Sequence, residues 1–416
     1  MKQTKAITQG ARRRGTVAVI VALLLTILMT VVAFSLDGGL ALEDRRRVQA
    51  AADAAALAAA NDLYINFPVY NGLDTPGSAA KAAQALALAN GYKDGDGDDT
   101  VTVNIPPLGG KFIGQSGYVE VIITYNQPRF FSAVIGSGPI PVKARAVARG
   151  LWAPVNDGII VLHPSLSGAL EANGNGDVYV QNSSIIVNSN DSTAAVTVGS
   201  AFIADPSKPT WITGKNPGYS GTIKDTIYTG VPPTPDPLAY LPAPDPSTMS
   251  IQNAPNGQNG VVNLQPGVYN KGLSFSGSTS VNMAPGIYYM KNGSFSFSGQ
   301  GNLNATGVMI YSEDGLSVTG LGSVTWSPPT TGIYKGISYF QDRTSTYTAK
   351  VAGDGLYNVT GTVYVPAGLT DLQGNGDASI ASQVITWTMK AGGNGQTNIV
   401  WAGPPVAPIR QLQLVE

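Results

Sequence analysis

Residues 38–61, GGLALEDRRRVQAAADAAALAAAN, pass within a few positions from glycine, through charged residues, to almost pure alanine. Alanine has the highest helix propensity, and no proline interrupts residues 40–64, so this stretch predicts a helix. Its apolar residues recur at spacings of three, four or eight and form one narrow stripe of small side chains. The stripe predicts a face that packs closely against a partner, and the two glycines before it permit a bend.

An uncharged apolar segment, TVAVIVALLLTILMTVVAFSL, precedes this helix at residues 16–36. A helix of this length rises roughly 30 Å, which matches the hydrocarbon core of a bilayer. The alternative is a secretory signal peptide cleaved near Ala41, but the apolar region of such a peptide is usually about 7 to 15 residues long. We therefore predict a transmembrane helix over residues 16–36.

The charges on either side of the apolar segment predict its orientation. Residues 1–15 carry the basic residues Lys2, Lys5, Arg12, Arg13 and Arg14 and no acid. The arginines that follow the segment are accompanied by acidic residues, so the positive-inside rule predicts a cytoplasmic basic tail over 1–15 and an exported remainder. We therefore predict a single-pass protein of the inner (cytoplasmic) membrane. A twin-arginine signal at Arg12–Arg14 is an alternative, although the long apolar segment favours a plain topogenic role.

The composition predicts a mainly β protein with more than one domain. The chain has 416 residues, of which 12% are charged, 50 are glycine and 28 are proline. Its net charge of −1 gives no indication of a nucleic-acid partner. Cysteine is absent and His163 is the single histidine, which excludes disulfides, thiol catalysis and multi-histidine metal sites.

Residues 37–150 predict a small α+β module of the pilin-like kind. After the alanine-rich helix, a second helical stretch runs from Ala79 to Asn90 and ends at a glycine suited to a C-cap. Alternating or β-branched residues then predict strands at 100–105, 118–125 and 140–148.

Short apolar motifs repeat in the second half of the chain at intervals of about 19 to 22 residues, within the range of solenoid repeats. The aligned positions are Leu273 with Phe295 and Leu316, Val281 with Leu303 and Val324, Val268 with Ile287, and Ile287 with Val308. Three short strands per repeat predict a right-handed parallel β-helix over residues 151–416. Prolines remove ladder donors from residues 230–247, which predicts a surface loop, and the end from Ala402 predicts a terminal cover or a free tail.

Two motifs are candidates for a functional site. Asp94, Asp96 and Asp98 resemble the start of a calcium loop, but Asp99 and Ile105 occupy the positions of its glycine and its bidentate glutamate. We predict a polar turn there, with weak calcium binding as the alternative. His163 has no second histidine or cysteine as a partner, so we predict a strand-edge or hydrogen-bonded residue. No catalytic, cofactor-binding or metal-binding residue is assigned.

An anchored carbohydrate-active enzyme, a polysaccharide lyase or hydrolase, is the alternative function for a β-helix. Such chemistry needs clustered carboxylates beside a basic residue. The acids after residue 260 are few: Glu313, Asp314, Asp342, Asp354, Asp371, Asp377 and Glu416. We therefore predict a non-enzymatic adhesive or spacer domain, with a glycan on the polar β surface as a candidate ligand.

The N-terminal region carries a recognisable signature in residues 12–60, RRRGTVAVIVALLLTILMTVVAFSLDGGLALEDRRRVQAAADAAALAAA. It resembles the Flp pilus-assembly TadG-like (TadE/TadG-like) family in its basic start, its single span, the aspartate at the outer end (Asp37) and the arginine-led alanine helix. The strand VKARAVARG, which ends at Gly150, resembles the close of the same family's membrane-proximal module. The resemblance implies a bacterial single-pass envelope protein with membrane, pilus-assembly or other envelope partners. The long repeat region departs from the short family members, as does the lack of a prepilin cleavage motif.

Overall fold

The computed structural model divides the chain into two compact units, residues 1–152 with 410–416 and residues 153–409. The described residues are 13–95, 99–134, 136–153, 157–175, 178–201, 203–204, 208–214, 226–255, 259–353, 356–374, 378–394, 397–401 and 406–416. The second unit is thus an insertion in the chain of the first. Residues 410–416 belong to the first unit, whereas the sequence analysis placed them with 151–416.

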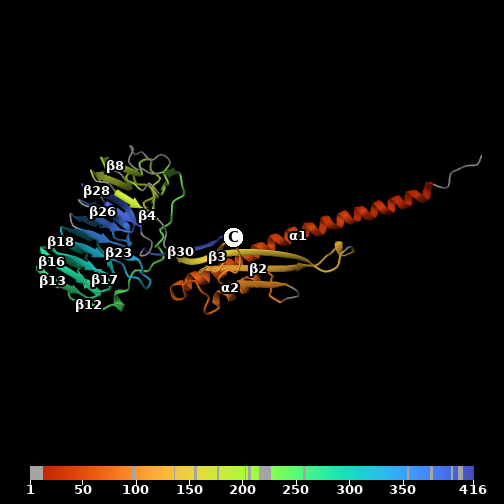
Figure 1. The fold of residues 1–416 in the computed structure, drawn as a ribbon, viewed down its shortest axis with the longest axis horizontal. Coiled ribbons are helices and arrows are strands. Elements are labelled where there is room, and N and C mark those ends of the chain that lie inside the picture. Colours follow the sequence, from red (N-terminus) through yellow and green to blue (C-terminus); the bar gives the residue numbers. More distant parts are fainter. Residues whose placement is uncertain are drawn as a thin grey trace, which may run out of the picture. The chain divides into compact units, whose positions relative to one another are not determined.

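The first unit contains a long helix, a short helix and a four-stranded sheet (Figure 1). Its elements are α1 (Arg13–Tyr70), α2 (Ser78–Ala89), β1 (Thr100–Asn104), η1 (Gly110–Phe112), β2 (Tyr118–Gln127), η2 (Ser132–Val134), β3 (Ile140–Ala153) and β30 (Ile409–Leu414). The sheet order is β1-β2-β3-β30, with β1–β2 and β2–β3 antiparallel. Both predicted helices and the three predicted strands are present, and α1 unites the predicted transmembrane and alanine-rich helices.

The alanine stripe of α1 packs in the core of the first unit. Ala52, Ala55, Ala56, Ala59 and Ala60 are all fully buried, in one cluster with apolar residues of α2 and the sheet. A Cβ atom on Gly150 of β3 would lie only 1.7 Å from the carbonyl oxygen of Ala60. The helix and the strand therefore approach so closely that small side chains are a steric requirement.

The second unit is built from parallel strands that form three ladders. Ladder one contains, in order, β12 (Ile251–Gln252), β14 (Gly267–Asn270), β17 (Gly286–Lys291), β20 (Val308–Ser312), β23 (Ile337–Gln341), β26 (Thr362–Gly374), β28 (Gln383–Gly393), β4 (Asp157–Val161), β7 (Ser184–Val187), β10 (Thr210–Ile212) and β11 (Ile227–Thr229). Ladder two contains β15 (Leu273–Phe275), β18 (Phe295–Gly299), β21 (Leu316–Gly320), β24 (Ala349–Gly353), then β26 and β28 again, β5 (Leu170–Gly174) and β8 (Ala195–Gly199). Because the long strands β26 and β28 belong to both ladders, the two ladders form one sheet of 17 strands.

Ladder three is a separate parallel sheet of nine strands. It contains β13 (Asn259–Leu264), β16 (Ser278–Met283), β19 (Leu303–Ala305), β22 (Val324–Trp326), β25 (Tyr357–Val359), β27 (Ala378–Ala381), β29 (Thr397–Val400), β6 (Val178–Gln181) and β9 (Ile203–Ala204). Side chains from all three ladders, among them Phe297, Trp326 and Tyr339, meet in a single buried cluster. The prediction of a mainly β chain with one long apolar N-terminal helix is confirmed.

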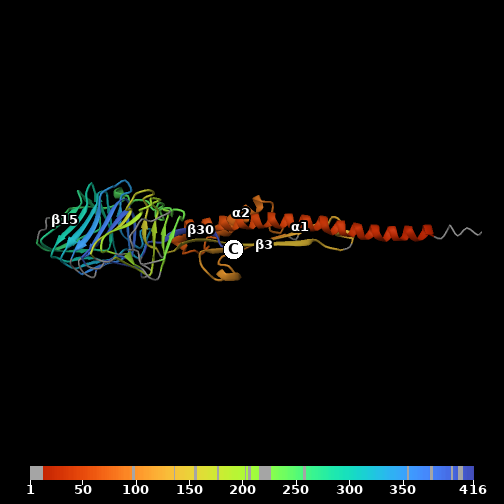
Figure 2. The ribbon, with the colours of Figure 1, turned by 90° about the horizontal axis from the view of Figure 1, so that it is seen from above.

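The order of strands in each ladder differs from their order along the chain (Figures 1 and 2). Strand β28 pairs with both β4 and β5, and β29 pairs with β6, so the last strands of the unit stack directly on the first. On the outer side of this junction, the Nζ atom of Lys390 lies 3.4 Å from Oε1 of Glu171. The chain therefore enters and leaves the second unit at neighbouring positions within the ladders, as an inserted unit requires.

The proline-rich residues 230–247 lie against the outer face of ladder one and form no strand. Leu238 and Leu241 are buried there among aromatic residues of the ladder. The Nη2 atom of Arg343 donates to the carbonyl oxygens of both leucines, at 2.9 and 2.7 Å. This segment connects β11 at one end of ladder one to β12 at the other end.

The repeat alignment is correct for two ladders and wrong for ladder one. Leu273 pairs with Phe295, and Val281 with Leu303, as predicted. In ladder one, however, Ile287 pairs with Met309 instead of Val308. Val268 likewise pairs with Tyr289 instead of Ile287. Every residue of β20 is buried, because the proline-rich segment covers the outer face of this strand. The strand therefore lacks the alternation of buried apolar and exposed polar residues that would indicate its register.

A column of glycines follows one edge of ladder two. A Cβ atom on Gly393 would lie 2.1 Å from the carbonyl oxygen of Gly374, and one on Gly174 would lie 2.6 Å from that of Gly393. Gly393 also has a φ of 121°, which side-chain-bearing residues rarely adopt. Backbones of successive strands therefore approach closely at this edge, and the repeated GNGD motif contributes to the column.

Replacing Gly393 with alanine should destabilise the second unit, because both the φ angle and the approach of Gly374 exclude a methyl group. We expect a cost on the order of 2 kcal/mol or more, which lowers the melting temperature by roughly 4 to 8 °C. The measurement is thermal unfolding of the full chain followed by circular dichroism. Gly260→Ala is the control, since its φ of 100° is similar but no atom lies within 4 Å of the added Cβ. Equal losses from both substitutions would contradict the steric explanation.

Candidate membrane-anchoring site

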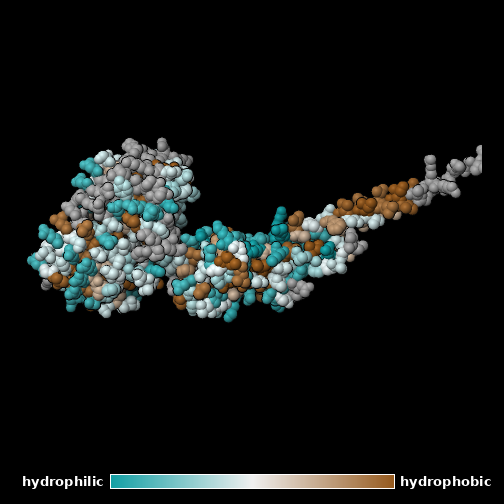
Figure 3. Space-filling view, in the orientation of Figure 1, coloured by the Kyte–Doolittle hydropathy of each residue, from teal (hydrophilic) through white to brown (hydrophobic). Residues whose placement is uncertain are grey.

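The first part of α1 exposes a long apolar surface. The large apolar side chains between Val17 and Leu36 are 44 to 65% exposed. The hydroxyl groups in this stretch donate to carbonyl oxygens one turn earlier, as Thr26 does to Ala22 at 2.9 Å. Among the described residues, α1 is the one helix long and apolar enough to cross a membrane, and Figure 3 shows this apolar surface. The helix thus exposes an extensive apolar surface and satisfies its own polar groups. Both properties are consistent with a single-pass membrane anchor.

The helix continues without a break from the apolar segment into the folded unit. Gly38 and Gly39 lie within α1, and a Cβ atom at either position would meet nothing within 4 Å. The bend that the two glycines permit is therefore absent from the structure. The apolar segment and the alanine stripe are parts of one rod.

Asp37 ends the apolar segment and is bound to the connection between β2 and β3. Its carboxylate is 2% exposed and accepts hydrogen bonds from the backbone N–H of Phe131 at 3.2 Å and of Ser132 at 2.7 Å. The hydroxyl group of Ser132 donates to the same carboxylate at 2.5 Å. A carboxylate satisfied by three donors stays ionised at little cost, so Asp37 can hold the connection against α1.

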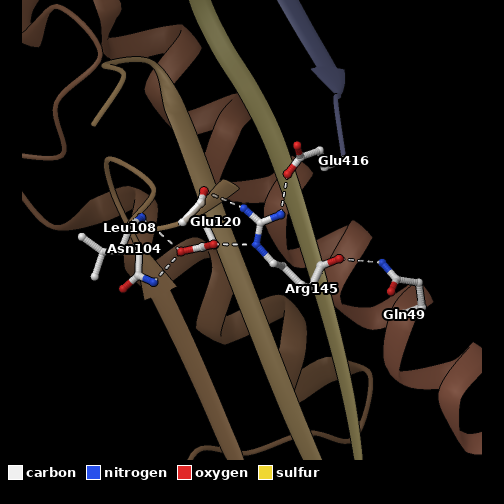
Figure 4. A network of polar contacts seen from close by, with 7 residues as sticks. Gln49, Asn104, Leu108, Glu120, Arg145 and Glu416 are labelled. Carbon is white, nitrogen blue, oxygen red and sulfur yellow. Dashed lines mark hydrogen bonds and ion pairs between the residues drawn. The ribbon is translucent and has the colours of Figure 1, made fainter. Parts of the chain in front are cut away.

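A second polar network fixes the sheet to α1 beyond Asp37 (Figure 4). Glu120, on β2, accepts hydrogen bonds from the side chain of Asn104 at 2.8 Å and from Nε of Arg145 at 2.6 Å. Arg145 also forms an ion pair with Glu416, and its carbonyl oxygen accepts from Gln49 of α1 at 3.1 Å. The network therefore joins α1, β1, β2, β3 and the segment that follows β30.

The protonation of Glu120 follows from this network. Its side chain is only 3% exposed, and burial alone would raise the pKa. The hydrogen bonds from Asn104 and Arg145 outweigh burial and lower the pKa below its ordinary value of 4.5. Glu120 is therefore an ionised structural group at neutral pH.

The predicted polar turn at residues 94–99 is only partly described. Asp94 accepts a hydrogen bond from the N–H of Val101 at 3.0 Å, and Asp99 accepts one from the N–H of Asn126 at 2.8 Å. Both carboxylates thus cap backbone groups of the sheet. Asp96 and Asp98 lie outside the described residues, and the residues that are described contain no group of three or more metal-ligating side chains.

His163 has the hydrogen-bonded surroundings that the sequence predicts. Its Nδ1 atom accepts from the N–H groups of Ser165 at 3.2 Å and Leu166 at 3.0 Å. Its ring packs on Trp387 with 4.6 Å between ring centroids, and burial lowers its pKa. The two hydrogen bonds occupy Nδ1 of the neutral imidazole, so His163 has a structural role in this turn.

Three acidic residues of the second unit, Glu313, Asp342 and Asp371, are held in different local contacts. Glu313 accepts from the hydroxyl group of Tyr289 at 2.8 Å, and Asp342 accepts from that of Tyr311 at 2.5 Å. Asp371 lies 3.6 Å from Nζ of Lys350. Burial opposes ionisation of Asp342, but hydrogen bonds from Thr344 and Tyr311 prevail and lower its pKa. A general acid needs the opposite shift, which burial produces at Asp157 of β4. Asp354 and Asp377 lie outside the described residues.

Comparison with known families supports the assignment of the N-terminal region. Residues 15–62 match the sequence model of the family described as putative Flp pilus-assembly TadE/G-like. The N-terminal region is TadE/G-like. The match covers most of α1, including the apolar segment, Asp37 and the alanine stripe. No curated protein and no solved structure matches the chain significantly.

Sequence reasoning found the anchor but missed the groups that hold it to the sheet. Glu120 is the one charged residue of the predicted strand YVEVIITY, and Arg145 is one of two basic residues in VKARAVA. Two opposite charges in neighbouring strands are a signal for a cross-strand ion pair. Nothing local to Ser132 indicates that it binds Asp37, because the two residues are far apart in sequence.

Replacing Glu120 with glutamine should reduce stability and also change its pH dependence. The lowered pKa means that Glu120 stabilises the fold above its unfolded-state pKa, and this contribution is lost as pH falls through the folded-state pKa, below 4.5. We expect a loss on the order of 2 kcal/mol at neutral pH and a flatter decline of the unfolding free energy in acid. Urea unfolding across this pH range measures both effects. Glu43→Gln, at an exposed ion pair with Arg47, is the control and should cost little stability; an equal loss of unfolding free energy in both variants would refute this role of Glu120.

Proposed function

We propose that the chain is a bacterial envelope protein of Flp/Tad pilus assembly or surface adhesion, anchored by a single transmembrane helix. In this proposal residues 16–36 cross the inner (cytoplasmic) membrane, residues 1–15 stay in the cytoplasm, and both units are exported. The TadE/G-like match of residues 15–62 is the observation that carries the proposal. The exposed apolar surface of α1 and the basic residues before it support the anchor and its orientation.

The second unit is proposed to be a right-handed parallel β-helix. Consecutive strands visit the ladders in rotation: β17, β18 and β19 belong to ladders one, two and three, and β20, β21 and β22 repeat this sequence. Their inward side chains share one buried cluster, as expected for a coil of three faces. We propose a right-handed coil because crossover connections between parallel strands are right-handed in nearly all known cases.

The first unit is proposed to be a pilin-like module that meets pilus-assembly or other envelope proteins. It pairs a long N-terminal helix with an antiparallel arrangement of β1, β2 and β3, and the alanine stripe of the helix is buried on this sheet. The alanine stripe is already covered by α2 and the sheet of the same unit. Partners would therefore meet other faces of α1 or the exported second unit.

An adhesive or spacer role fits the second unit better than catalysis. Glu313, Asp342 and Asp371 each serve a hydrogen bond or an ion pair, and Asp342 has a lowered pKa. On ladder three, Asn263, Asn282 and Asn304 form a column at the surface, with amide contacts of 3.1 and 2.9 Å between neighbours. Stacked amides stiffen a solenoid, and their free edges offer hydrogen bonds to a glycan.

The topology can be tested with single cysteines, because the chain contains none. Lys5→Cys lies before the span, and Ser274→Cys lies at an exposed position of β15. In spheroplasts, a membrane-impermeant maleimide should label Ser274→Cys directly and Lys5→Cys only after lysis, with both variants in the membrane fraction. Release of a soluble protein shortened near Ala41, or the reverse labelling pattern, would contradict the proposed anchor.

The cellular role can be tested in the same strain. Loss of the chain should reduce pilus formation or surface attachment, and the full chain should restore it. A version whose residues 16–36 are replaced with a cleavable signal peptide should be exported but should not restore attachment. Full restoration by this released version would show that the anchor is dispensable for function.

A further inference from the structure

The connection between β2 and β3 reaches α1 at the outer end of the apolar segment. Figures 1 and 2 both show the end of the β2–β3 hairpin beside α1. Ala33 is 7% exposed, although its large apolar neighbours Val32 and Phe34 are 44 and 56% exposed. Asp37, one helical turn further on, accepts the hydrogen bonds of Phe131 and Ser132. The hairpin end is therefore placed against the last turn of the apolar segment and the turn that follows it.

Two adjacent aromatic side chains project from this hairpin end. Phe130 is 62% exposed and Phe131 is 54% exposed. Large aromatic side chains are costly to leave in water, and contiguous exposed apolar patches mark contact surfaces. The exposed Phe34 and Leu36 of α1 continue the apolar surface at the same level of the helix.

The hairpin end is preformed instead of being a free loop. Arg129 donates from Nε to the carbonyl oxygen of Gly138 at 2.9 Å and from Nη1 to the hydroxyl group of Ser132 at 3.2 Å. The N–H of Gly136 donates to the carbonyl oxygen of Ser132 at 3.0 Å. Together with Asp37, these bonds close the connection and fix the direction of its backbone.

Helix geometry sets the depth of the two phenylalanines in a bilayer. An α-helix rises about 1.5 Å per residue, so residues 16–36 fill a hydrocarbon core of roughly 30 Å and Asp37 lies at its outer boundary. Because the N–H of Phe131 binds the carboxylate of Asp37, the backbone of Phe131 lies at the same level. Exposed apolar side chains such as phenylalanine and leucine are buried at the boundary between headgroups and acyl chains when they lie at this level.

We propose that Phe130 and Phe131 insert into the outer headgroup region of the same bilayer that α1 crosses. The proposal rests on the proposed anchoring function. The lipid interface is chosen as the occupant because the phenylalanines continue the apolar surface of the membrane segment. With this second contact, the first unit is held to the membrane at two points, which restricts the tilt of α1 and its rotation about its own axis.

The test uses the full chain with one fluorescent label, reconstituted in phosphatidylethanolamine and phosphatidylglycerol vesicles. An environment-sensitive dye is attached to Phe130→Cys, and lipids brominated near the headgroup serve as quenchers. Leu28→Cys, within the apolar segment, reports on the anchor itself, with lipids brominated deep in the acyl chain as its quenchers. Leu108→Cys is the matched control, because Leu108 is 72% exposed and lies beside Glu120, at the opposite end of β2 from Phe130.

The expected result is quenching of the Phe130 label several-fold stronger than that of the Leu108 label. Equal weak quenching at both positions, with strong quenching at Leu28, would overturn this inference and leave the anchor intact. Weak quenching at Leu28 would instead refute the anchor, and the inference with it. If the Phe130 position is protected from aqueous reagents in cells but its label is not quenched in vesicles, the phenylalanines contact a protein partner. This result would also overturn the lipid assignment.

Discussion

The close contact between the alanine stripe of α1 and the sheet is the constraint on which the first unit depends. Gly150 lies so near the carbonyl oxygen of Ala60 that no side chain fits between β3 and the helix. Small residues on both surfaces let backbone approach backbone, and dispersion contacts are then made along the full length of the interface. The same helix continues without a break through Gly38 and Gly39 into the apolar segment. An interaction that fixes the apolar segment in place therefore also fixes the position of the sheet.

The insertion of the second unit follows from where its strands pair. Strands β28 and β29 stack on β4, β5 and β6, so the first and last strands of the unit are neighbours. A unit whose ends lie together can be inserted into a surface connection without disturbing the host sheet. The proline-rich residues 230–247 make this possible, because they carry the chain along ladder one from β11 to β12.

Much of this fold was predictable from local patterns, and the exceptions have physical reasons. The apolar segment, the alanine helix and the three strands of the first unit have strong periodic signals, and they occur where expected. The register of Ile287 was not predictable, since consecutive residues of β17 and β20 are buried and the apolar pattern loses its period of two. The pairing of β28 with β4 and the bond between Ser132 and Asp37 depend on residues far apart in the chain, for which a single sequence holds no signal.

The continuity of α1 across the membrane boundary is the central claim, and a distance between two spin labels tests it most directly. Leu28 and Arg46 are both exposed on α1, and eighteen residues of α-helix return to the same face after a rise of about 27 Å. With cysteines at these positions in the full chain in lipid nanodiscs, we expect one narrow distance distribution near that value. A broad distribution, or a clearly shorter distance, would show a hinge at the two glycines and would contradict the account of anchor and sheet as parts of one rod.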